Sequence, residues 1–128
     1  MGNKVTDKNI KLLIVDDNIE IRNLIRLSFK RLPKIEVFEA TNGEEAFKIF
    51  QELKPDIVLS DIMMPGKIDG LVLCKQIKAS KQNCPVILIS GKGQQSDIEL
   101  GMKAGADIYK VKPFNPTEII SIVEKFAS

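Results

Sequence analysis

The chain has 128 residues, of which 44% are hydrophobic and 28% are charged, and its formal net charge at pH 7 is +2. This length predicts one domain with a sizeable core, and the composition argues against a disordered chain. A net charge this small does not favour direct binding to nucleic acid, and the absence of histidine removes imidazole as a base, a metal ligand or a phosphoryl carrier.

The cysteines and the hydrophobic pattern constrain the cellular location. Cys74 and Cys84 lack metal-ligand spacing, and two thiols do not form a disulfide framework in a domain of this size. No stretch approaches the roughly 20 apolar residues that span a bilayer, and the polar start of the chain lacks the apolar core of a signal peptide. We therefore expect a cytoplasmic protein with ordinary thiols and no membrane insertion.

The first third of the chain alternates apolar runs with helical periodicity. Leu12–Val15 is entirely apolar, as expected of a strand that is covered on both faces. Residues 18–31 show helical periodicity, and a weaker strand is predicted over Ile35–Phe38. Asn42-Gly43-Glu44-Glu45 then opens a second helix as a capping box, and that helix ends at Lys54-Pro55.

The same alternation continues to the end of the chain. The further expected strands are Ile57–Leu59, Val86–Ile89 and Asp107–Val111, and the further expected helices are Gly70–Ala79, Gln94–Lys103 and one starting at Asn115. The last helix has a strong start, Asn115-Pro116-Thr117-Glu118, with an asparagine cap, a proline in the first turn and a glutamate three residues after the cap. Five strands and five helices predict an α/β fold around a parallel sheet, in one domain over 1–128 with a core of about 11–126.

Five polar residues stand at the ends of four predicted strands. Asp16 and Asp17 follow the first strand, Asp61 the third, Ser90 the fourth and Lys112 the fifth. In an open parallel sheet, ligands bind at the carboxyl ends of the strands. The sequence therefore predicts a functional site that combines these carboxylates, a hydroxyl and an amine.

The chemistry of this set favours a divalent cation and a phosphoryl group. Mg²⁺ is held by one or two carboxylates, and Asp16 or Asp17 together with Asp61 meets that requirement. A cation also relieves the repulsion among crowded carboxylates. Asp61 is then a candidate nucleophile that forms an aspartyl phosphate, with Lys112 and the Ser90 hydroxyl stabilising the phosphoryl oxygens.

In these residues and their spacing the chain resembles the receiver domains of bacterial response regulators, including the single-domain chemotaxis regulators of two-component signalling. The matching motifs are Val15-Asp16-Asp17, Asp61-Ile62-Met63-Met64-Pro65, Ile89-Ser90-Gly91, Gly105-Ala106-Asp107 and Lys112-Pro113-Phe114. The resemblance covers residues 11–126. It implies a flavodoxin-like, doubly wound, five-stranded parallel sheet with strand order 2-1-3-4-5, and phosphorylation by a histidine kinase or phosphotransfer protein.

The resemblance also implies a role for each acid. Asp61 matches the phosphoacceptor, and Asp16 and Asp17 match the acids that bind Mg²⁺ or Mn²⁺. Met63 matches the position that offers the metal a backbone carbonyl. The expected metal ligands are therefore Asp16, Asp17, Asp61 and Met63.

The remaining matches concern the phosphate and the switch. Ser90 and Lys112 match the phosphate-binding hydroxyl and amine, and Tyr109 matches an aromatic ring that turns inward as the hydroxyl moves toward the phosphate. The Lys112–Pro113 peptide is expected to be cis. The segment Gly66-Lys67-Ile68 departs from the family pattern, because it makes the loop one residue longer than usual.

These observations predict a phosphorylation-dependent signalling switch and not an enzyme, since the chain would assist only its own phosphorylation and dephosphorylation. The phosphoryl group would change the face formed by the fourth helix, the fifth strand and the fifth helix, and a downstream output protein would read that face. The chain ends soon after the last helix, so we expect no output domain within it.

Two other functions are weighed against this one. A receiver-shaped module could bind partners without phosphorylation, but none of the acids and neither the serine nor the lysine is missing. A flavin- or nucleotide-binding domain would need a glycine-rich turn after the first strand, where this chain has Asp16-Asp17-Asn18.

Simpler structural interpretations also exist for single residues. Asp17 with Glu20 makes a good capping box, and Tyr109 can be a half-buried sheet residue. The basic stripe of Arg22, Arg26 and Lys30 is expected to be a solvated face.

Overall fold

The structure is a computed structural model that describes residues 9–127. Within this range, five strands alternate with five helices along the chain. The strands are β1 (Ile10–Val15), β2 (Ile35–Ala40), β3 (Ile57–Asp61), β4 (Val86–Ser90) and β5 (Ile108–Val111). The helices are α2 (Ile19–Ser28), α3 (Gly43–Leu53), α4 (Gly70–Ala79), α5 (Gln95–Lys103) and α6 (Pro116–Ala127). The expected domain bounds include residues 1–8 and 128, which lie outside the described part.

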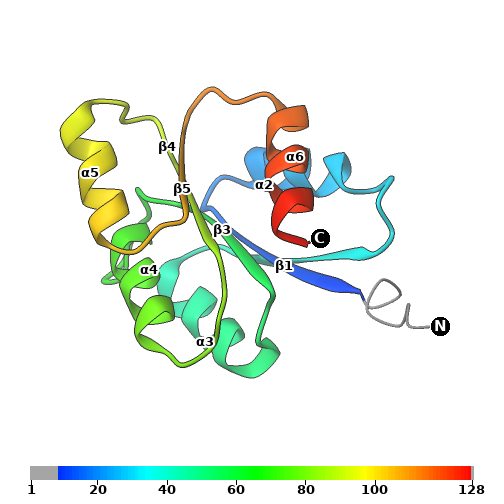
Figure 1. Ribbon diagram of the computed structural model, residues 1–128, viewed down its shortest axis with the longest axis horizontal. Coiled ribbons are helices and arrows are strands. Elements are labelled where there is room, and N and C mark those ends of the chain that lie inside the picture. The colour runs from blue at the N-terminus through cyan, green and yellow to red at the C-terminus, as the bar shows by residue number, and fades with distance from the viewer. Residues whose placement is uncertain (1–8, 128) are drawn as a thin grey trace.

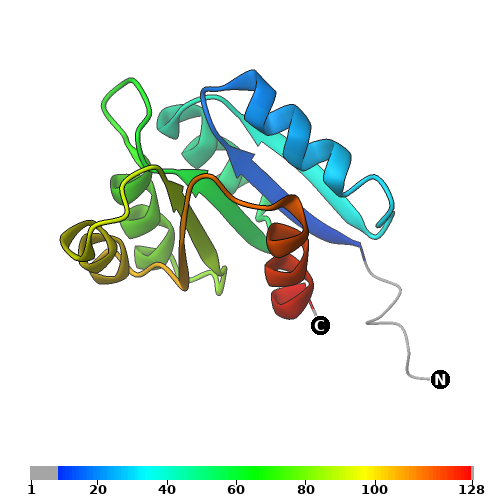
Figure 2. The same ribbon diagram turned by 90° about the horizontal axis from the view of Figure 1, so that it is seen from above.

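All five strands form one parallel sheet in the order β2-β1-β3-β4-β5. The prediction of a doubly wound sheet with order 2-1-3-4-5 is therefore confirmed. Helices α2 and α6 cover one face of this sheet, and α3, α4 and α5 cover the other (Figure 1). Figure 2 shows the same three layers from above.

Successive residues of β1 face opposite layers of the core. Leu12 and Ile14 pack with Ile25 of α2, whereas Leu13 and Val15 belong to the cluster under α3 and α4. All four strand residues are buried. Burying a side chain of this size stabilises a fold by about 1.5–3 kcal/mol, so a central strand can be apolar along its whole length.

Side chains fix the starts of α3 and α6 close to where the sequence predicts them. Asn42 Oδ1 accepts a hydrogen bond from the Glu45 N–H at 2.8 Å, which is half of the expected capping box. The Glu45 carboxylate bonds the Thr41 N–H instead of the Asn42 N–H. At α6, Asn115 Oδ1 accepts from the Thr117 N–H. These contacts occupy helix N–H groups that would otherwise lack a partner.

Helix α2 is shorter than the predicted 18–31. It ends at Ser28, where the N–H of Phe29 is shared between the carbonyls of Ile25 and Arg26. The N–H of Lys30 then bonds the carbonyl of Leu27, so the last turn tightens to three-residue spacing before Pro33 is reached. None of the helices in residues 9–127 has the length and apolar character needed to cross a bilayer.

Candidate functional site

The three predicted acids meet at the carboxyl ends of β1 and β3. Val15 is paired with Ser60 in the sheet, so the next residues along the two strands, Asp16 and Asp61, lie at the same edge. One carboxylate oxygen from each of Asp16, Asp17 and Asp61 lies within 4.8 Å of the other two. Asp16 and Asp61 are buried, and Asp17 is exposed.

The turn after β1 holds Asp16 and leaves the Asp17 carboxylate free. Asp16 Oδ1 accepts a hydrogen bond from the Asn18 N–H at 2.9 Å. Asn18, and not Asp17, caps α2, because its Oδ1 accepts from the N–H groups of Glu20 and Ile21. The capping-box interpretation of Asp17 and Glu20 is therefore wrong. Among residues 9–127, no hydrogen bond or ion pair involves the carboxylate of Asp17.

Lys112 brings a cation to this cluster from the end of β5. Its Nζ lies 3.5 Å from Asp16 Oδ2 and 3.5 Å from Asp61 Oδ1. Both distances are long for a hydrogen bond, so the amine is near the two acids without being tightly bound to either. The Lys112–Pro113 peptide is cis, as the family resemblance implies.

The electrostatics of Asp61 are unfavourable in the absence of a ligand. Burial raises the pKa of its carboxyl, and the neighbouring charge of Asp16 raises it further, while Lys112 lowers it. A divalent cation would add positive charge at this point and reduce the repulsion between the two acids. Three carboxylates with oxygens in mutual reach also match the oxygen ligands that Mg²⁺ prefers, so the residues fit such an ion.

Ser90 and Tyr109 both contact the main chain of Lys92, in the loop between β4 and α5. Ser90 Oγ accepts a hydrogen bond from the Lys92 N–H at 3.1 Å, and the Tyr109 hydroxyl donates to the Lys92 carbonyl at 2.7 Å. Ser90 is fully buried, and Tyr109 is half-buried against α5, where a Cβ on Gly101 would lie 2.5 Å from its ring. The two predicted switch residues are thus connected through one peptide segment.

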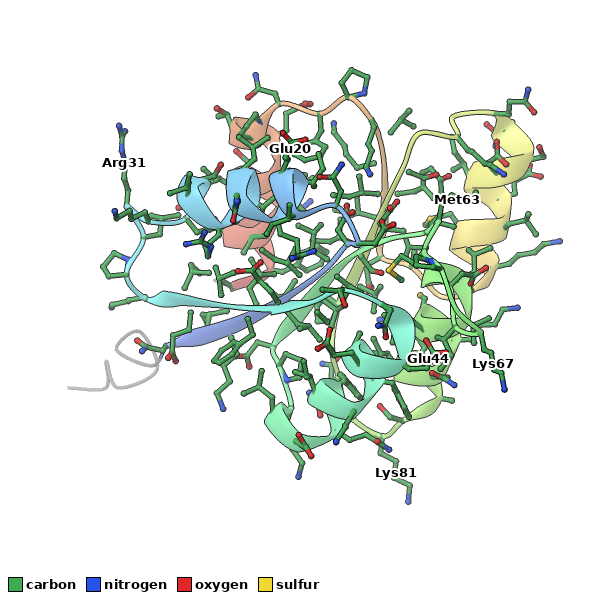
Figure 3. The ribbon with its side chains drawn as sticks, turned by 180° about the vertical axis from the view of Figure 1, so that it is seen from behind. Glu20, Arg31, Glu44, Met63, Lys67 and Lys81 are labelled. Carbon is green, nitrogen blue, oxygen red and sulfur yellow. The ribbon has the colours of Figure 1, made fainter. Side chains whose placement is uncertain are left out.

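The long loop after β3 rests on the start of α3. Glu44 Oε2 accepts a hydrogen bond from the Lys67 N–H at 3.0 Å, and Figure 3 shows these two residues on neighbouring segments. Gly66 has a φ of +102°, which only glycine adopts readily. Met63 lies earlier in the same loop, with an exposed side chain. Glu44 was not predicted to contact this loop.

Arg22 is a buried charge that sequence reasoning missed, and its partner Glu39 is 29% exposed. Arg22 is only 9% exposed, so the expectation that it belongs to a solvated basic face is wrong. Its Nε pairs with Glu39 Oε1 at 3.0 Å, and Arg26 Nε approaches Glu39 Oε2 at 3.2 Å. The spacing of Arg22, Ile25 and Phe29 places the arginine on the inward stripe of α2, and this signal could have revealed it.

The two cysteines take no part in the site. Burial raises the pKa of the Cys74 thiol to about 11 and that of Cys84 to about 12. At neutral pH both are therefore protonated, and a thiol in that state is a poor nucleophile and metal ligand. The prediction of ordinary thiols agrees with this.

A model of the response regulator receiver domain matches residues 12–124 of this chain. Among curated proteins, the alkaline phosphatase synthesis transcriptional regulatory protein PhoP of Bacillus subtilis is 39% identical over 87% of this chain and 45% of its own length. The transcriptional regulatory protein ResD of the same organism is 41% identical over 86% of this chain and 45% of its own length. The chain thus spans less than half the length of these two relatives.

A solved structure gives the same result for the fold. The Francisella response regulator 1452 receiver domain superimposes with a TM-score of 0.86 at 32% identity. The match covers 93% of this chain and 97% of that domain.

Proposed function

This chain belongs to the family of response regulator receiver domains, and we propose that it is a phosphorylation-dependent switch in which Asp61 accepts the phosphoryl group. The observation that carries this proposal is the position of Lys112 Nζ, 3.5 Å from both Asp16 and Asp61, beside three carboxylates that can share a cation. As a receiver it assists only its own phosphorylation and dephosphorylation.

The reaction at Asp61 is an in-line displacement. A carboxylate oxygen of Asp61 forms a bond to phosphorus while the phosphorus–nitrogen bond of a phosphohistidine donor breaks. The bonding electron pair stays on the donor's imidazole nitrogen. Asp61 is suited to this role because it is buried at the centre of the site, at the end of β3 between β1 and β4.

Asp16, Asp17, Asp61 and the Met63 carbonyl would hold Mg²⁺ or Mn²⁺. When bound, such an ion supplies positive charge next to the phosphoryl oxygens. Lys112 supplies a second positive charge next to Asp61, and its loose contacts leave it free to turn toward a phosphoryl oxygen.

The switch would run through Lys92. A phosphoryl oxygen on Asp61 competes for the Ser90 hydroxyl, and movement of that hydroxyl releases the Lys92 N–H. The Lys92 carbonyl holds the Tyr109 hydroxyl, so a shift of this segment also frees Tyr109 to take another position. Differential contacts in the two states are what a ligand-driven switch requires.

The output face would comprise α5, β5 and α6, which are the fourth helix, fifth strand and fifth helix of the chain. It presents exposed apolar side chains, namely Leu100 at 55%, Met102 at 47% and Val111 at 37% exposure. Exposed apolar groups of this kind are suited to a protein partner. A downstream output protein, or an output domain joined to this one, would read the change there.

The phosphoryl donor would dock at the surface next to Lys112. A shallow hollow of about 400 Å³ lies there, and its lining is mostly apolar: Ile21, Leu24, Lys112, Pro113 and Phe114. A histidine kinase or phosphotransfer protein that covers this hollow would bring its phosphohistidine next to the lysine and to Asp61. The hollow is therefore a suitable contact for an apolar surface of the donor.

Intact-mass spectrometry tests the phosphoacceptor directly. The purified protein is incubated with Mg²⁺ and acetyl phosphate, beside Asp61→Asn and, as a matched control, Glu20→Gln, an exposed acid on α2. We expect one added phosphoryl group in the wild type and in Glu20→Gln, none in Asp61→Asn, and none without metal. Labelling of Asp61→Asn would mean that another residue is the phosphoacceptor.

A failure to label the wild type would favour the phosphorylation-independent module. This result must hold with phosphoramidate and a short quench, because an aspartyl phosphate hydrolyses readily. Capture of partners by the unphosphorylated protein would then be the function to pursue.

The switch itself can be followed by fluorescence, because Tyr109 is the only tyrosine and the chain has no tryptophan. Addition of Mg²⁺ with beryllofluoride, a mimic of the phosphoryl group, is expected to change Tyr109 emission. Ser90→Ala should lose most of that change. An unchanged emission in a protein that binds beryllofluoride would contradict the role of Tyr109.

A further inference from the structure

Arg22 is a buried cation for which the phosphoryl reaction has no direct use. Its neighbours on the basic stripe, Arg26 and Lys30, are exposed, whereas Arg22 is 9% exposed and lies one turn into α2. A guanidinium is rarely buried unless it is paired, because its desolvation is unfavourable. Its contacts therefore indicate what it does.

The guanidinium joins three segments. Its Nε pairs with Glu39 on β2 at 3.0 Å, and its Nη1 donates a buried hydrogen bond of 2.7 Å to the main-chain carbonyl of Asp16. Figures 2 and 3 both show α2 lying alongside β1 and β2, which places these groups on one side of the sheet. Arg22 thus connects the acidic turn to the edge strand.

The Asp16 carbonyl belongs to the peptide that precedes Asp17. The N–H of Asp16 is bonded to the Ala40 carbonyl at 3.1 Å, and its carboxylate is bonded to the Asn18 N–H. Arg22 adds the bond to the carbonyl, so both peptides that flank Asp16 are held. Rotation of the second peptide would swing the Asp17 side chain away from Asp61.

Asp17 depends on this restraint more than its neighbours do. No other residue in 9–127 bonds to its carboxylate, so the backbone alone sets its direction. We propose that Arg22 is a positioning residue that holds Asp17 in place as a metal ligand, a role that rests on the proposed function. Loss of a group that orients a metal ligand typically weakens metal binding by 10- to 100-fold.

The competing explanation is that the pair of Arg22 and Glu39 only stabilises the fold. A double-mutant cycle separates the two explanations, because a residue that acts through another has no effect once that other residue is gone. The variants are Arg22→Met, Asp17→Asn and their combination. Arg26→Met is the matched control, since it removes another partner of Glu39 but no bond to Asp16.

The readout is binding of Mn²⁺, followed by the electron paramagnetic resonance of the free ion. We expect Arg22→Met to raise the Kd about tenfold. Arg26→Met should leave the Kd unchanged, and Arg22→Met should have no further effect in the Asp17→Asn background. Equal losses in both backgrounds, or no loss in the wild-type background, would overturn the proposal.

A second measurement needs no metal. The order parameter of the Asp17 amide, from ¹⁵N relaxation, should fall in Arg22→Met and stay unchanged in Arg26→Met. If the wild type fails to bind Mn²⁺, the proposed metal site is wrong, and this amide decides on its own whether Arg22 restrains Asp17. If Arg22→Met does not fold, Arg22→Lys replaces it, because it keeps the positive charge but loses the rigid fork that holds Nε on Glu39 and Nη1 on the Asp16 carbonyl.

Discussion

The two ends of the parallel sheet both gather charged side chains, but they pair them differently. At the amino-terminal end, Lys78 Nζ donates to Asp107 Oδ2 at 2.7 Å and to the Cys84 carbonyl at 3.0 Å. The same Asp107 oxygen accepts the Val86 N–H at 2.8 Å. These three contacts are short, and they connect α4 to the start of β4 and β5.

At the carboxyl-terminal end, the charges around Asp61 stay apart. Lys112 Nζ stays 3.5 Å from each of two acids, and the pKa of Asp61 is raised by burial and by Asp16. Side chains that are fully paired stabilise the native state, whereas groups left without short contacts can take up a ligand. One end of the sheet is therefore built for stability and the other for a change of state.

After Asp61→Asn, Lys112→Ala should have the largest functional effect. It removes a contact to the phosphoryl group but no metal ligand, so we expect the change in Tyr109 emission with beryllofluoride to be lost. The Kd for Mn²⁺ should stay within about threefold of the wild-type value, because the distances of 3.5 Å indicate a weak interaction with the acids. Loss of Mn²⁺ binding would contradict this division of roles.

Asp107→Ala should have the largest effect on stability. It leaves Lys78 Nζ with a single acceptor and the Val86 N–H without one. Because Asp107 is about one-third exposed, we expect a loss of about 1–2 kcal/mol in the free energy of unfolding. Urea titration measures it, and labelling by acetyl phosphate should persist in the folded protein.

The matched control for this stability change is Glu124→Ala, on the exposed face of α6. It should leave the free energy of unfolding within about 0.5 kcal/mol of wild type. If Asp107→Ala lowers the free energy of unfolding no more than this control does, the contacts at the amino-terminal end of the sheet do not stabilise the fold.

Asp61→Asn should stabilise the metal-free protein. A carboxyl whose pKa is higher in the folded state favours folding when it is protonated, so ionised Asp61 lowers stability above its folded-state pKa. We expect a melting temperature a few degrees above wild type at pH 7, with a gain that shrinks as the pH falls toward the ordinary aspartate value of about 3.9. Calorimetry in a chelating buffer measures both.

Bound metal should reverse the order of the melting temperatures of the wild type and Asp61→Asn. An ion that binds only the folded wild type stabilises it in proportion to the logarithm of its concentration over its Kd. With saturating Mg²⁺, the wild type should gain more than Asp61→Asn. A higher melting temperature for the wild type in the absence of metal would show that its acids are not in conflict.

The sequence predicts the fold and the five site residues because their signals are local. Asp61 ends β3 and Lys112 directly follows β5, and the strand order that brings such ends together is a property of the parallel βα fold. The cap of α2 could not be assigned in the same way. Asp17 and Asn18 are both good cap residues, and only the turn geometry decides between them.

The contacts that surround the site were less predictable. Arg22 could have been found, because it has the helical spacing of the inward residues Ile25 and Phe29. Glu39 lies on the same face of β2 as Ile35, since the two are four residues apart in a strand. Two opposite charges at inward positions of successive elements indicate an ion pair that is shielded from solvent on one side. The role of Lys92 could not be predicted, because its peptide groups make the contacts and any residue type supplies those.

The ion pair between Lys110 and Glu118 is expected to have the smallest effect on stability, because it is exposed. The two charges are 2.7 Å apart on the output face, and the bond to Lys110 lowers the pKa of the Glu118 carboxyl. Because water screens this exposed pair, we expect Glu118→Gln to leave the melting temperature unchanged between pH 5 and pH 8. Any contribution of the ionised glutamate would be lost only as the pH falls through its lowered pKa, well below that range. A melting temperature of Glu118→Gln several degrees below wild type at pH 7 would mean that a short ion pair stabilises this fold even when it is exposed to water. The difference between the two ends of the sheet would then come from the contact distances and not from burial.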